Sequence, residues 1–240
     1  MFRGFYAAGT ALDAAAQAQD VTAENLAHMS TTGYRQRGVT FETFDRVLGR
    51  AVAPCGDYVG TRLDRVYHDF SPGANQPTGA PLDVAIADGN TFFSVDGPDG
   101  RLLTRNGNFQ LNAQRQIVTQ GGYPVQGIGG PIVLPPGAGN IQIAGDGTVS
   151  ADTVPVGRLR LVRVADTKQL TAVGPTLYQI GDGAGAFAAE GRVVQGFREG
   201  ANVNPAEAMV RMIIGSRYYE AAQRVLRTMA ESVQLNTKPT

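Results

Sequence analysis

The sequence predicts a mixed α and β fold, with long N- and C-terminal helices that pair as a coiled-coil-like α domain and a central all-β domain between them. Three observations lead to this prediction. Residues 1–28 and roughly 205–235 are rich in helix formers, and no proline stands between Pro205 and Pro239. Between these segments, glycine and proline recur every few residues. Short runs of apolar and polar residues alternate between those turn signals, which is typical of β-hairpins.

The predicted N-terminal helix carries a heptad stripe in which large residues mostly alternate with small ones. Such a stripe lets another helix approach closely and seats large side chains over small ones. About 26 residues give a helix roughly 39 Å long, and Gly33 can take the left-handed conformation that stops a helix. One heptad position holds Phe5, Leu12, Gln19 and Leu26, and the other holds Gly9, Ala16 and Ala23.

The predicted C-terminal helix repeats this alternation and has a clear start. Asn204 can cap the helix, while Pro205 suits its first position and Glu207 its third. Each glycine inside a helix costs about 1 kcal/mol of propensity, which buried contact with a partner helix offsets. The pattern leaves that partner open, as either the other helix of the chain or another subunit. One heptad position holds Met212, Tyr219, Leu226 and Val233, and the other holds Ala208, Gly215, Ala222 and Met229.

The central region predicts short strands that are separated by Asp-Gly and Asn-Gly turns, such as those at Asp96 and Asn106. The composition shifts divide the chain into an N-terminal helix (1–33), a linker or extended arm (34–80), a β domain (81–200) and a C-terminal helix (201–240). The expected strands lie at 82–86, 92–95, 102–104, 109–111, 141–143 and 159–164.

The composition argues against several classes of function. The 21 basic and 21 acidic residues cancel, so there is no general attraction to nucleic acid or anionic lipid. Cys55 is the single cysteine, which excludes an internal disulfide and a cysteine-based zinc site. The longest uncharged stretch, 116–145, contains several prolines and cannot form a spanning helix. Gly4, Gly9 and Asp13 make the N-terminus a poor signal peptide.

No residue pattern predicts a catalytic, cofactor-binding or metal-binding site. Three of the carboxylates at Asp83, Asp88, Asp96 and Asp99 lie in or beside turns, where aspartate is ordinary. The glycine-rich run 181–185 lacks the spacing of a phosphate-binding loop. His28 and His68 have no companions at ligand spacing, and Cys55 has no nearby histidine.

The linker carries balanced charges and two phenylalanines. Its arginines indicate either a salt-bridged subunit contact or a solvated face. Phe41 and Phe44 are expected to pack on the adjoining domain. The arginines are Arg35, Arg37, Arg46, Arg50, Arg62 and Arg65, and the acidic residues that balance them are Glu42, Asp45, Asp57, Asp64 and Asp69.

Four stretches, in order along nearly the whole chain, resemble the flagellar rod and hook protein family of bacteria. Residues 21–35, VTAENLAHMSTTGYR, are similar to its N-terminal signature, and 81–86 with 104–109 to its central motif. Residues 122–125 and 145–149 continue that motif, and 199–210, EGANVNPAEAMV, resemble its C-terminal signature. Two departures are Glu24 beside Asn25, where the family often has paired asparagines, and His28, where it often has asparagine.

The resemblance implies a non-enzymatic axial protein without a cofactor, most similar to the proximal rod component, with the distal rod protein as an alternative. Its subunits would stack helically into a hollow rod that crosses the periplasm. It would leave the cell through the flagellar export apparatus, without a cleaved signal peptide. The paired terminal helices would form the inner tube and the β domain would lie outside. Its partners would be other rod and axial proteins and copies of itself, without nucleic acid and without membrane insertion.

This resemblance favours packing between subunits for the terminal stripes, together with pairing of the two helices in one chain. A contact that does not close on itself generates a filament, and isolated helices gain little until their stripes are buried. Asn25, Asn202 and Asn204 are expected at helix ends and subunit contacts. The alternative from another class is a secreted β-rich enzyme or sugar-binding protein with helical flanks. The predicted assembly interface comprises Phe5, Leu12, Ala16, Ala23, Asn25, Leu26, Asn202, Asn204, Met212, Gly215, Tyr219, Ala222, Leu226 and Val233.

Overall fold

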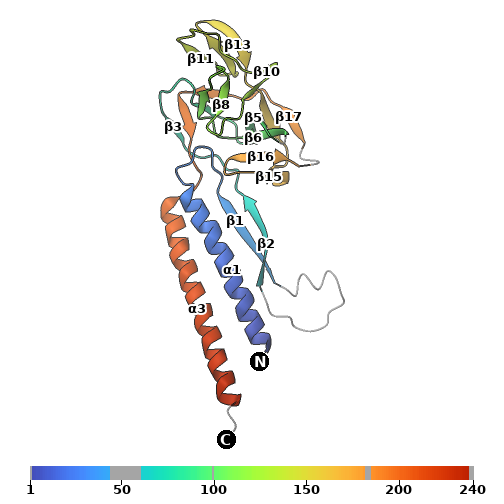
Figure 1. The fold of residues 1–240 in the computed structure, drawn as a ribbon, viewed down its shortest axis with the longest axis vertical. Helices are drawn as coiled ribbons and strands as arrows, with labels where there is room; N and C mark the ends of the chain where they lie inside the picture. The colour runs from blue at the N-terminus through green and yellow to red at the C-terminus, as the bar shows by residue number, and fades with distance from the viewer. Residues whose placement is uncertain (1, 44–60, 99, 182–184, 238–240) are drawn as a thin grey trace. The chain divides into compact units, whose positions relative to one another are not determined.

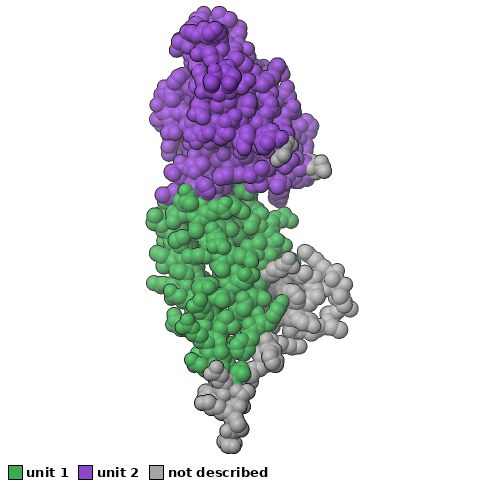
Figure 2. All heavy atoms as spheres, in the orientation of Figure 1, with its two compact units in different colours: residues 1–27, 37–68, 204–240 green, residues 28–36, 69–203 purple. Residues whose placement is uncertain are grey.

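A computed structural model describes residues 2–43, 61–98, 100–181 and 185–237 (Figure 1). It confirms the mixed α and β class, with a long helix near each end of the chain and β structure between them. The chain divides into two compact units, coloured in Figure 2. Unit 1 comprises residues 1–27, 37–68 and 204–240, and unit 2 comprises 28–36 and 69–203. Several predicted features, among them Phe44, Cys55 and Asp99, lie outside the described residues.

Unit 1 consists of two long helices and a β-hairpin. Helix α1 spans Phe2–Ala27 and helix α3 spans Pro205–Thr237. Strands β1 (Arg37–Thr43) and β2 (Thr61–His68) pair antiparallel. The side chain of Thr10 joins α1 to the hairpin, because its Oγ1 accepts the backbone N–H of Thr61 at 3.3 Å. Much of the predicted linker is therefore regular structure that packs with the helices.

The start of α3 follows the predicted cap. The Asn204 Oδ1 accepts the backbone N–H groups of Ala206 and Glu207, at 3.1 and 3.4 Å. These two groups have no partner inside the helix, so the cap satisfies donors that would otherwise need water. Pro205 is the first helical residue, where its missing N–H costs nothing.

The end of α1 differs from the predicted stop. The helix ends at Ala27 and the chain then turns, with the Thr31 N–H donating to the His28 carbonyl at 2.9 Å. Gly33 does adopt a left-handed φ of 71°, but it does so within this turn of unit 2. A Cβ at Gly33 would collide with the backbone of Arg105 and Asn106. Glycine is thus required there by a close approach of two chain segments as well as by its φ.

Unit 2 is built on a six-stranded antiparallel sheet in the order β15-β16-β6-β5-β14-β17. A three-stranded sheet, β11-β12-β13, and the pairs β4/β18, β3/β19, β7/β8 and β9/β10 complete the unit. The bounds are β3 Asn75–Pro77, β4 Val84–Ile86, β5 Thr91–Gly97, β6 Gly100–Thr104, β7 Phe109–Leu111, β8 Ile117–Thr119, β9 Gln126–Gly127, β10 Gly130–Pro131, β11 Ile141–Ile143, β12 Thr148–Ala151, β13 Val154–Arg158, β14 Leu161–Val164, β15 Leu170–Ala172, β16 Leu177–Ile180, β17 Ala186–Ala188, β18 Val193–Gln195 and β19 Phe197–Glu199, with a 3-10 turn at Thr167–Gln169.

Strand β5 separates two hydrophobic clusters because successive side chains point to opposite faces of a sheet. Phe93 and Val95 join the larger cluster, in which Phe93 meets Phe109 edge to face at 5.0 Å between ring centroids. Phe92 points the other way and packs with Tyr178 and Leu103 in a smaller cluster. Burial on both faces makes this strand the centre of unit 2. Each of the six predicted strand segments overlaps an observed strand.

A buried ion cluster joins three distant parts of unit 2. The two oxygens of Glu199 accept from Arg35 Nη2 at 2.6 Å and from Arg105 Nε at 2.9 Å. The two guanidinium groups have no exposed surface, and the carboxylate has 1%. Arg35 is therefore an internal ion-pair partner, and neither the predicted subunit contact nor the predicted solvated face is correct for it. Burial lowers the pKa of Arg105, and Glu199 opposes that shift.

The cluster also holds the backbone around it. Glu199 Oε1 accepts the Gly73 N–H at 3.0 Å, and the Glu199 carbonyl accepts the Gly33 N–H at 2.7 Å. The Nη1 of Arg105 donates to the carbonyls of Asp88 and Thr91. One carboxylate thus connects segments that meet only when unit 2 is complete.

Replacing Glu199 with glutamine should strongly destabilise unit 2. The change leaves two buried guanidinium groups without a counter-charge, a loss of about 3–5 kcal/mol when one partner of a buried pair is removed. Hydrogen exchange of the β5 and β6 amides in the full chain measures this loss within unit 2. Glu207→Gln is the matched control, because its pair with Arg211 is more than half exposed and should change stability by no more than about 1 kcal/mol. Equal effects of the two changes would contradict the role given to the cluster.

The turn between β12 and β13 contains backbone strain. Asp152 and Thr153 have φ angles of 49° and 74°, which suit a hairpin turn of the mirror-image type but disfavour a β-branched residue. Thr153→Gly should therefore raise the free energy of unfolding by roughly 0.5–1 kcal/mol, as measured by urea denaturation. Thr171→Gly, at an exposed position of strand β15, is the control and should lower the free energy of unfolding. A lower stability for both variants would contradict the assignment of strain to Thr153.

Candidate assembly surface

Helices α1 and α3 run antiparallel along a shared seam, which is visible in Figure 1. Near one end, a Cβ added at Gly4 would lie 3.2 Å from the Met229 Cε. Further along, a Cβ at Gly215 would overlap the Gln19 Oε1. As the residue number rises in α1 it falls in α3, and these two pairs fix the register. Continuing that register puts Leu12 level with Ala222 and Leu26 level with Ala208, so a large residue faces a small one.

The predicted stripe of α3 coincides with the side that the structure covers. Its residues are buried or half-buried, whereas the residues on the opposite side of the helix are exposed. Because α1 is the element that lies along α3, this stripe faces the seam within the chain. The covered residues are Ala208, Met212, Gly215, Tyr219, Ala222, Leu226, Met229 and Val233.

The stripe predicted for α1 is half-buried, and a second side of the helix is buried more deeply. Ala14, Val21 and Asn25 are 5–9% exposed, and helical spacing places them opposite the stripe. The hairpin of β1 and β2 also packs on α1, so two sides of the helix are covered. Ala14 and Val21 lie off the heptad stripe of α1, so that pattern did not predict their burial. The half-buried residues of the stripe are Phe5, Leu12, Ala16, Ala23 and Leu26.

Asn25 and Asn202 bind backbone groups of their own chain. The side-chain amide of Asn25 donates to the Arg37 carbonyl at 2.7 Å and accepts the Arg37 N–H at 2.8 Å. It thus bonds both backbone groups of one residue, as a neighbouring β-strand does. Asn202 accepts the Gln36 N–H at 2.6 Å and donates to the carbonyls of Asp69 and Ser71, at 2.8 and 3.1 Å. An amide side chain can donate and accept at once, which suits these bridging positions.

The side of α3 away from the seam carries large apolar residues that no described element covers. Single exposed apolar residues are normal, but several of them along the uncovered side of one helix mark an interaction surface. The sequence pattern missed this face because the stripe on the seam side accounted for the heptad repeat. The residues and their exposed fractions are Met209 49%, Val210 54%, Ile213 55%, Ile214 47%, Tyr218 68% and Val225 45%.

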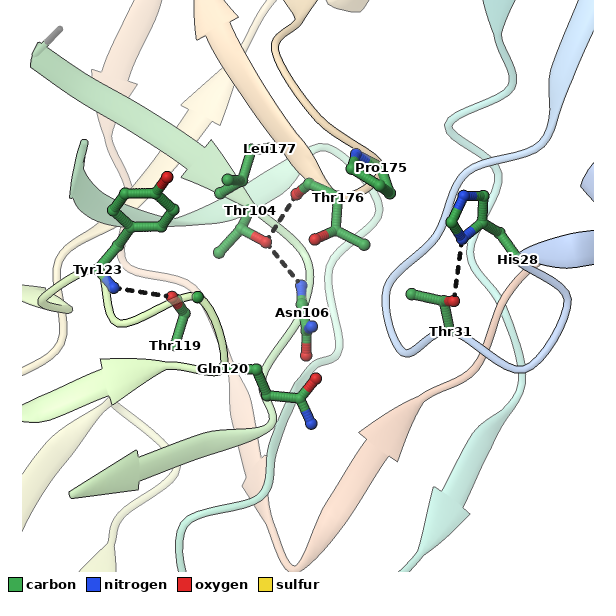
Figure 3. A pocket seen from close by; sticks show the side chains of 11 residues that line it. His28, Thr31, Thr104, Asn106, Thr119, Gln120, Tyr123, Pro175, Thr176 and Leu177 are labelled. Carbon is green, nitrogen blue, oxygen red and sulfur yellow. Dashed lines mark hydrogen bonds between the residues drawn. The ribbon is translucent and has the colours of Figure 1, made fainter. Parts of the chain in front are cut away.

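Unit 2 has a pocket of about 240 Å³ that is lined in part by His28 and Thr31, from the turn that follows α1 (Figure 3). The His28 Nδ1 lies 3.3 Å from the Thr31 Oγ1, and the His28 ring stacks on Tyr34 at 5.0 Å between centroids. The Thr104 hydroxyl donates to the Thr176 carbonyl at 2.8 Å and accepts the Asn106 N–H at 3.0 Å. His28 thus packs within this turn, beside hydroxyl and amide side chains that hold the surrounding loops.

Three of the four aspartates named in the sequence analysis have structural partners, and the fourth, Asp99, lies outside the described residues. Asp83, which is 6% exposed, pairs with Arg198 at 3.6 Å. Asp88 accepts the Arg192 N–H at 3.0 Å, and Asp96 accepts from the Gln126 amide. Within the described part of the chain, no group of three or more potential metal ligands gathers. The described helices include none that is both long and apolar enough to cross a membrane.

The linker residues differ in their surroundings. Arg37, at the start of β1, pairs with Glu24 of α1 inside unit 1, so this part of the predicted linker makes a salt bridge within the chain. Phe41 is 45% exposed, and it therefore retains much of the apolar surface that the sequence analysis expected to be packed.

Three family models match the chain in order. A model of flagellar basal body rod proteins matches residues 5–35, and the D1 domain model of the flagellar hook protein FlgE/F/G matches 85–151. The C-terminal model of the flagellar basal body rod FlgEFG proteins matches 194–235. The matched ranges contain most of α1, the centre of unit 2 and most of α3.

The curated relatives are rod proteins of similar length. The flagellar basal-body rod protein FlgF of Salmonella typhimurium is 37% identical over 93% of both chains, and that of Escherichia coli is 35% identical over 93% of both. The flagellar basal-body rod protein FlgG of Buchnera aphidicola from Schizaphis graminum is 31% identical over 98% of both chains. The paired terminal helices, the order of the family matches and this full-length similarity show that the chain belongs to the flagellar basal-body rod protein family of the FlgF/FlgG type.

Proposed function

We propose that this rod protein is a subunit of the proximal rod, which stacks with related axial proteins and with copies of itself into a hollow helical drive shaft. The similarity to proximal rod components supports this place. Two FlgF relatives, at 37% and 35% identity, exceed the 30–32% of the FlgG relatives, and a third FlgF relative, from Caulobacter vibrioides, is 30% identical. The distal rod is the second candidate, because FlgG relatives cover 98% of the chain. The secreted enzyme and the sugar-binding protein lose their support, since the homologues are structural rod proteins.

The uncovered apolar face of α3 is the observation that carries the assembly role. A helix with apolar residues on two opposite sides needs partners on both, and the chain supplies α1 on one side. The seam would pack as a short antiparallel coiled coil, in which Leu12, Gly215 and Ala222 set the distance between the helices. Neighbouring subunits would then cover the other side. A contact repeated in this way, without closure, generates a shaft.

The proposed function also includes export of the chain to the rod and a purely mechanical role there. The chain would pass the flagellar export apparatus and reach the periplasm-spanning rod without signal-peptide cleavage. Its role in the rod would be mechanical, and it would catalyse no reaction and need no cofactor. It would neither insert directly into a membrane nor bind nucleic acid.

Deletion of residues 2–27 should abolish motility and leave unit 2 folded. The deletion removes α1 but retains residues 28–36, including Arg35, which belong to unit 2. The test expresses the shortened chain in the source bacterium lacking the gene and follows swimming. Amide exchange in β5 and β6 of the purified chain checks the fold of unit 2. Swimming cells with the shortened chain would contradict the axial role.

Gly215→Leu should destabilise the pairing of α1 and α3 and reduce motility without changing unit 2. The added side chain would displace the Gln19 amide from the seam, and overpacking of this kind costs about 1–3 kcal/mol. Amide exchange in α1 and α3 should quicken, while that in β5 stays unchanged. Gly9→Leu is the matched control, because a Cβ at Gly9 meets nothing within 4 Å. Equal loss of motility for both variants would contradict close packing at Gly215.

A further inference from the structure

We propose that the outer face of α3 docks on the exposed side of α1 in a second copy of this chain, and that two charge pairs set the register. The pairs join Arg217 and Arg224 of one copy to Asp13 and Asp20 of the next. This inference rests on the proposed assembly role, and it names the helix face, the occupant and the residues that align it.

The apolar part of the surface follows a helical line on α3. Val210, Ile214, Tyr218 and Val225 are spaced by four, four and seven residues, so they share one side of the helix. Each is at least 45% exposed. Burial of such a stripe releases its water and drives association without selecting a register. Charges beside the stripe are needed for that selection.

Arg217 and Arg224 supply the positive charges. They are exposed and seven residues apart, which places them on one line of α3, roughly 10.5 Å apart along the axis. Their helical positions lie opposite the seam, between the apolar stripe and the exposed residue Ile213. No salt bridge joins either of them to a described residue, whereas Arg211, six residues before Arg217, pairs with Glu207 at 2.6 Å.

Asp13 and Asp20 supply the matching negative charges. They are exposed on α1 and are also seven residues apart, so their axial spacing equals that of the arginines. Asp13 accepts a hydrogen bond from the Gln17 amide at 3.0 Å, and no salt bridge joins Asp13 or Asp20 to a described residue. The exposed residue Tyr6 precedes Asp13 by the same interval. The side of α1 left open by α3 and the hairpin is thus acidic, with an aromatic residue at one end.

The geometry of unit 1 excludes pairing of these charges within one chain. The α1 helix of the same copy lies along the seam, at Gly215 and Met229. Arg217 and Arg224 are on the other side of α3, so Asp13 and Asp20 of the same chain face away from them. An α1 helix from another copy satisfies both lines of charge. The second copy would in turn offer its own α3 to a third, which continues the assembly.

Charge reversal tests this register in the full-length chain. One variant carries Asp13→Arg and Asp20→Arg, and a second carries Arg217→Glu and Arg224→Glu. Each variant alone would set like charges against each other, and the concentration for half-maximal self-association should rise roughly tenfold, given the modest strength of exposed pairs. Analytical ultracentrifugation measures this concentration. Arg101→Glu with Arg163→Glu, which changes exposed arginines of unit 2, is the control and should associate as the wild type does.

Recombination of the charges separates register from general charge effects. An equimolar mixture of the two variants, and a chain that carries all four changes, should each regain wild-type association, because opposite charges again face each other. Failure of both to recover would overturn the proposal, as would wild-type association of either variant alone or a wild-type chain that stays monomeric. A fall in the helical circular dichroism melting temperature of both variants, restored in the chain with all four changes but not in the mixture, would assign the pairs to a single chain and also overturn it.

Motility of the source bacterium distinguishes this proposal from the assembly role itself. If the wild-type gene restores swimming to a deletion strain and the two reversed variants also restore it fully, the rod role stands and the charge register fails. If the wild-type gene restores no swimming, the proposed function fails.

Discussion

The buried carboxylate of Glu199 is the interaction on which the order of unit 2 depends. It neutralises charge from two fully buried arginines, one of which follows α1 in sequence and the other of which follows β6. Buried charged side chains are tolerated only when an oppositely charged partner and hydrogen bonds replace the water that hydrates them. Because the three residues are far apart in sequence, their meeting requires that the turn after α1, the centre of the sheet and the end of β19 are in place together.

Near this ion cluster, side chains of unit 2 hold two segments of that unit that begin or end at a unit boundary. Residues 28–36 are held by Glu199 through Gly33 and by Asn202 through Gln36. The segment that begins at Asp69 is held by the Asn202 amide, and Asn25 performs the same task for β1 inside unit 1. The bonds go to backbone groups, so they fix the path of the chain and leave the apolar faces of the helices for other contacts.

Local signals explain what could be predicted from the sequence. The cap at Asn204, the stripe through Met212 and Tyr219 and the alternation at Phe92 and Phe93 act within a few residues, where helix and strand periodicity is decisive. The pairing of Arg35 with Glu199 was missed because 164 positions separate them and no local pattern connects two such residues. The hairpin of β1 and β2 was expected as a linker, since its charged side chains hide the strand alternation. Asn25 and Asn202 were predicted at helix ends and subunit contacts, whereas the backbone partners that they bind in their own chain depend on the tertiary fold.

Unit 1 is built from three separate segments of the chain, and this affects the order in which the chain folds. Its helix pair joins the first residues of the chain to the last ones, with the whole of unit 2 between them. Contacts at such long sequence separation form late, because the chain must first lose the entropy of closing that loop. When the chain emerges with its N-terminus first, α1 therefore has no α3 to pair with until nearly all of the other residues have emerged. Unit 1 therefore cannot complete its fold early, because α1 and α3 pair only after the whole chain has emerged.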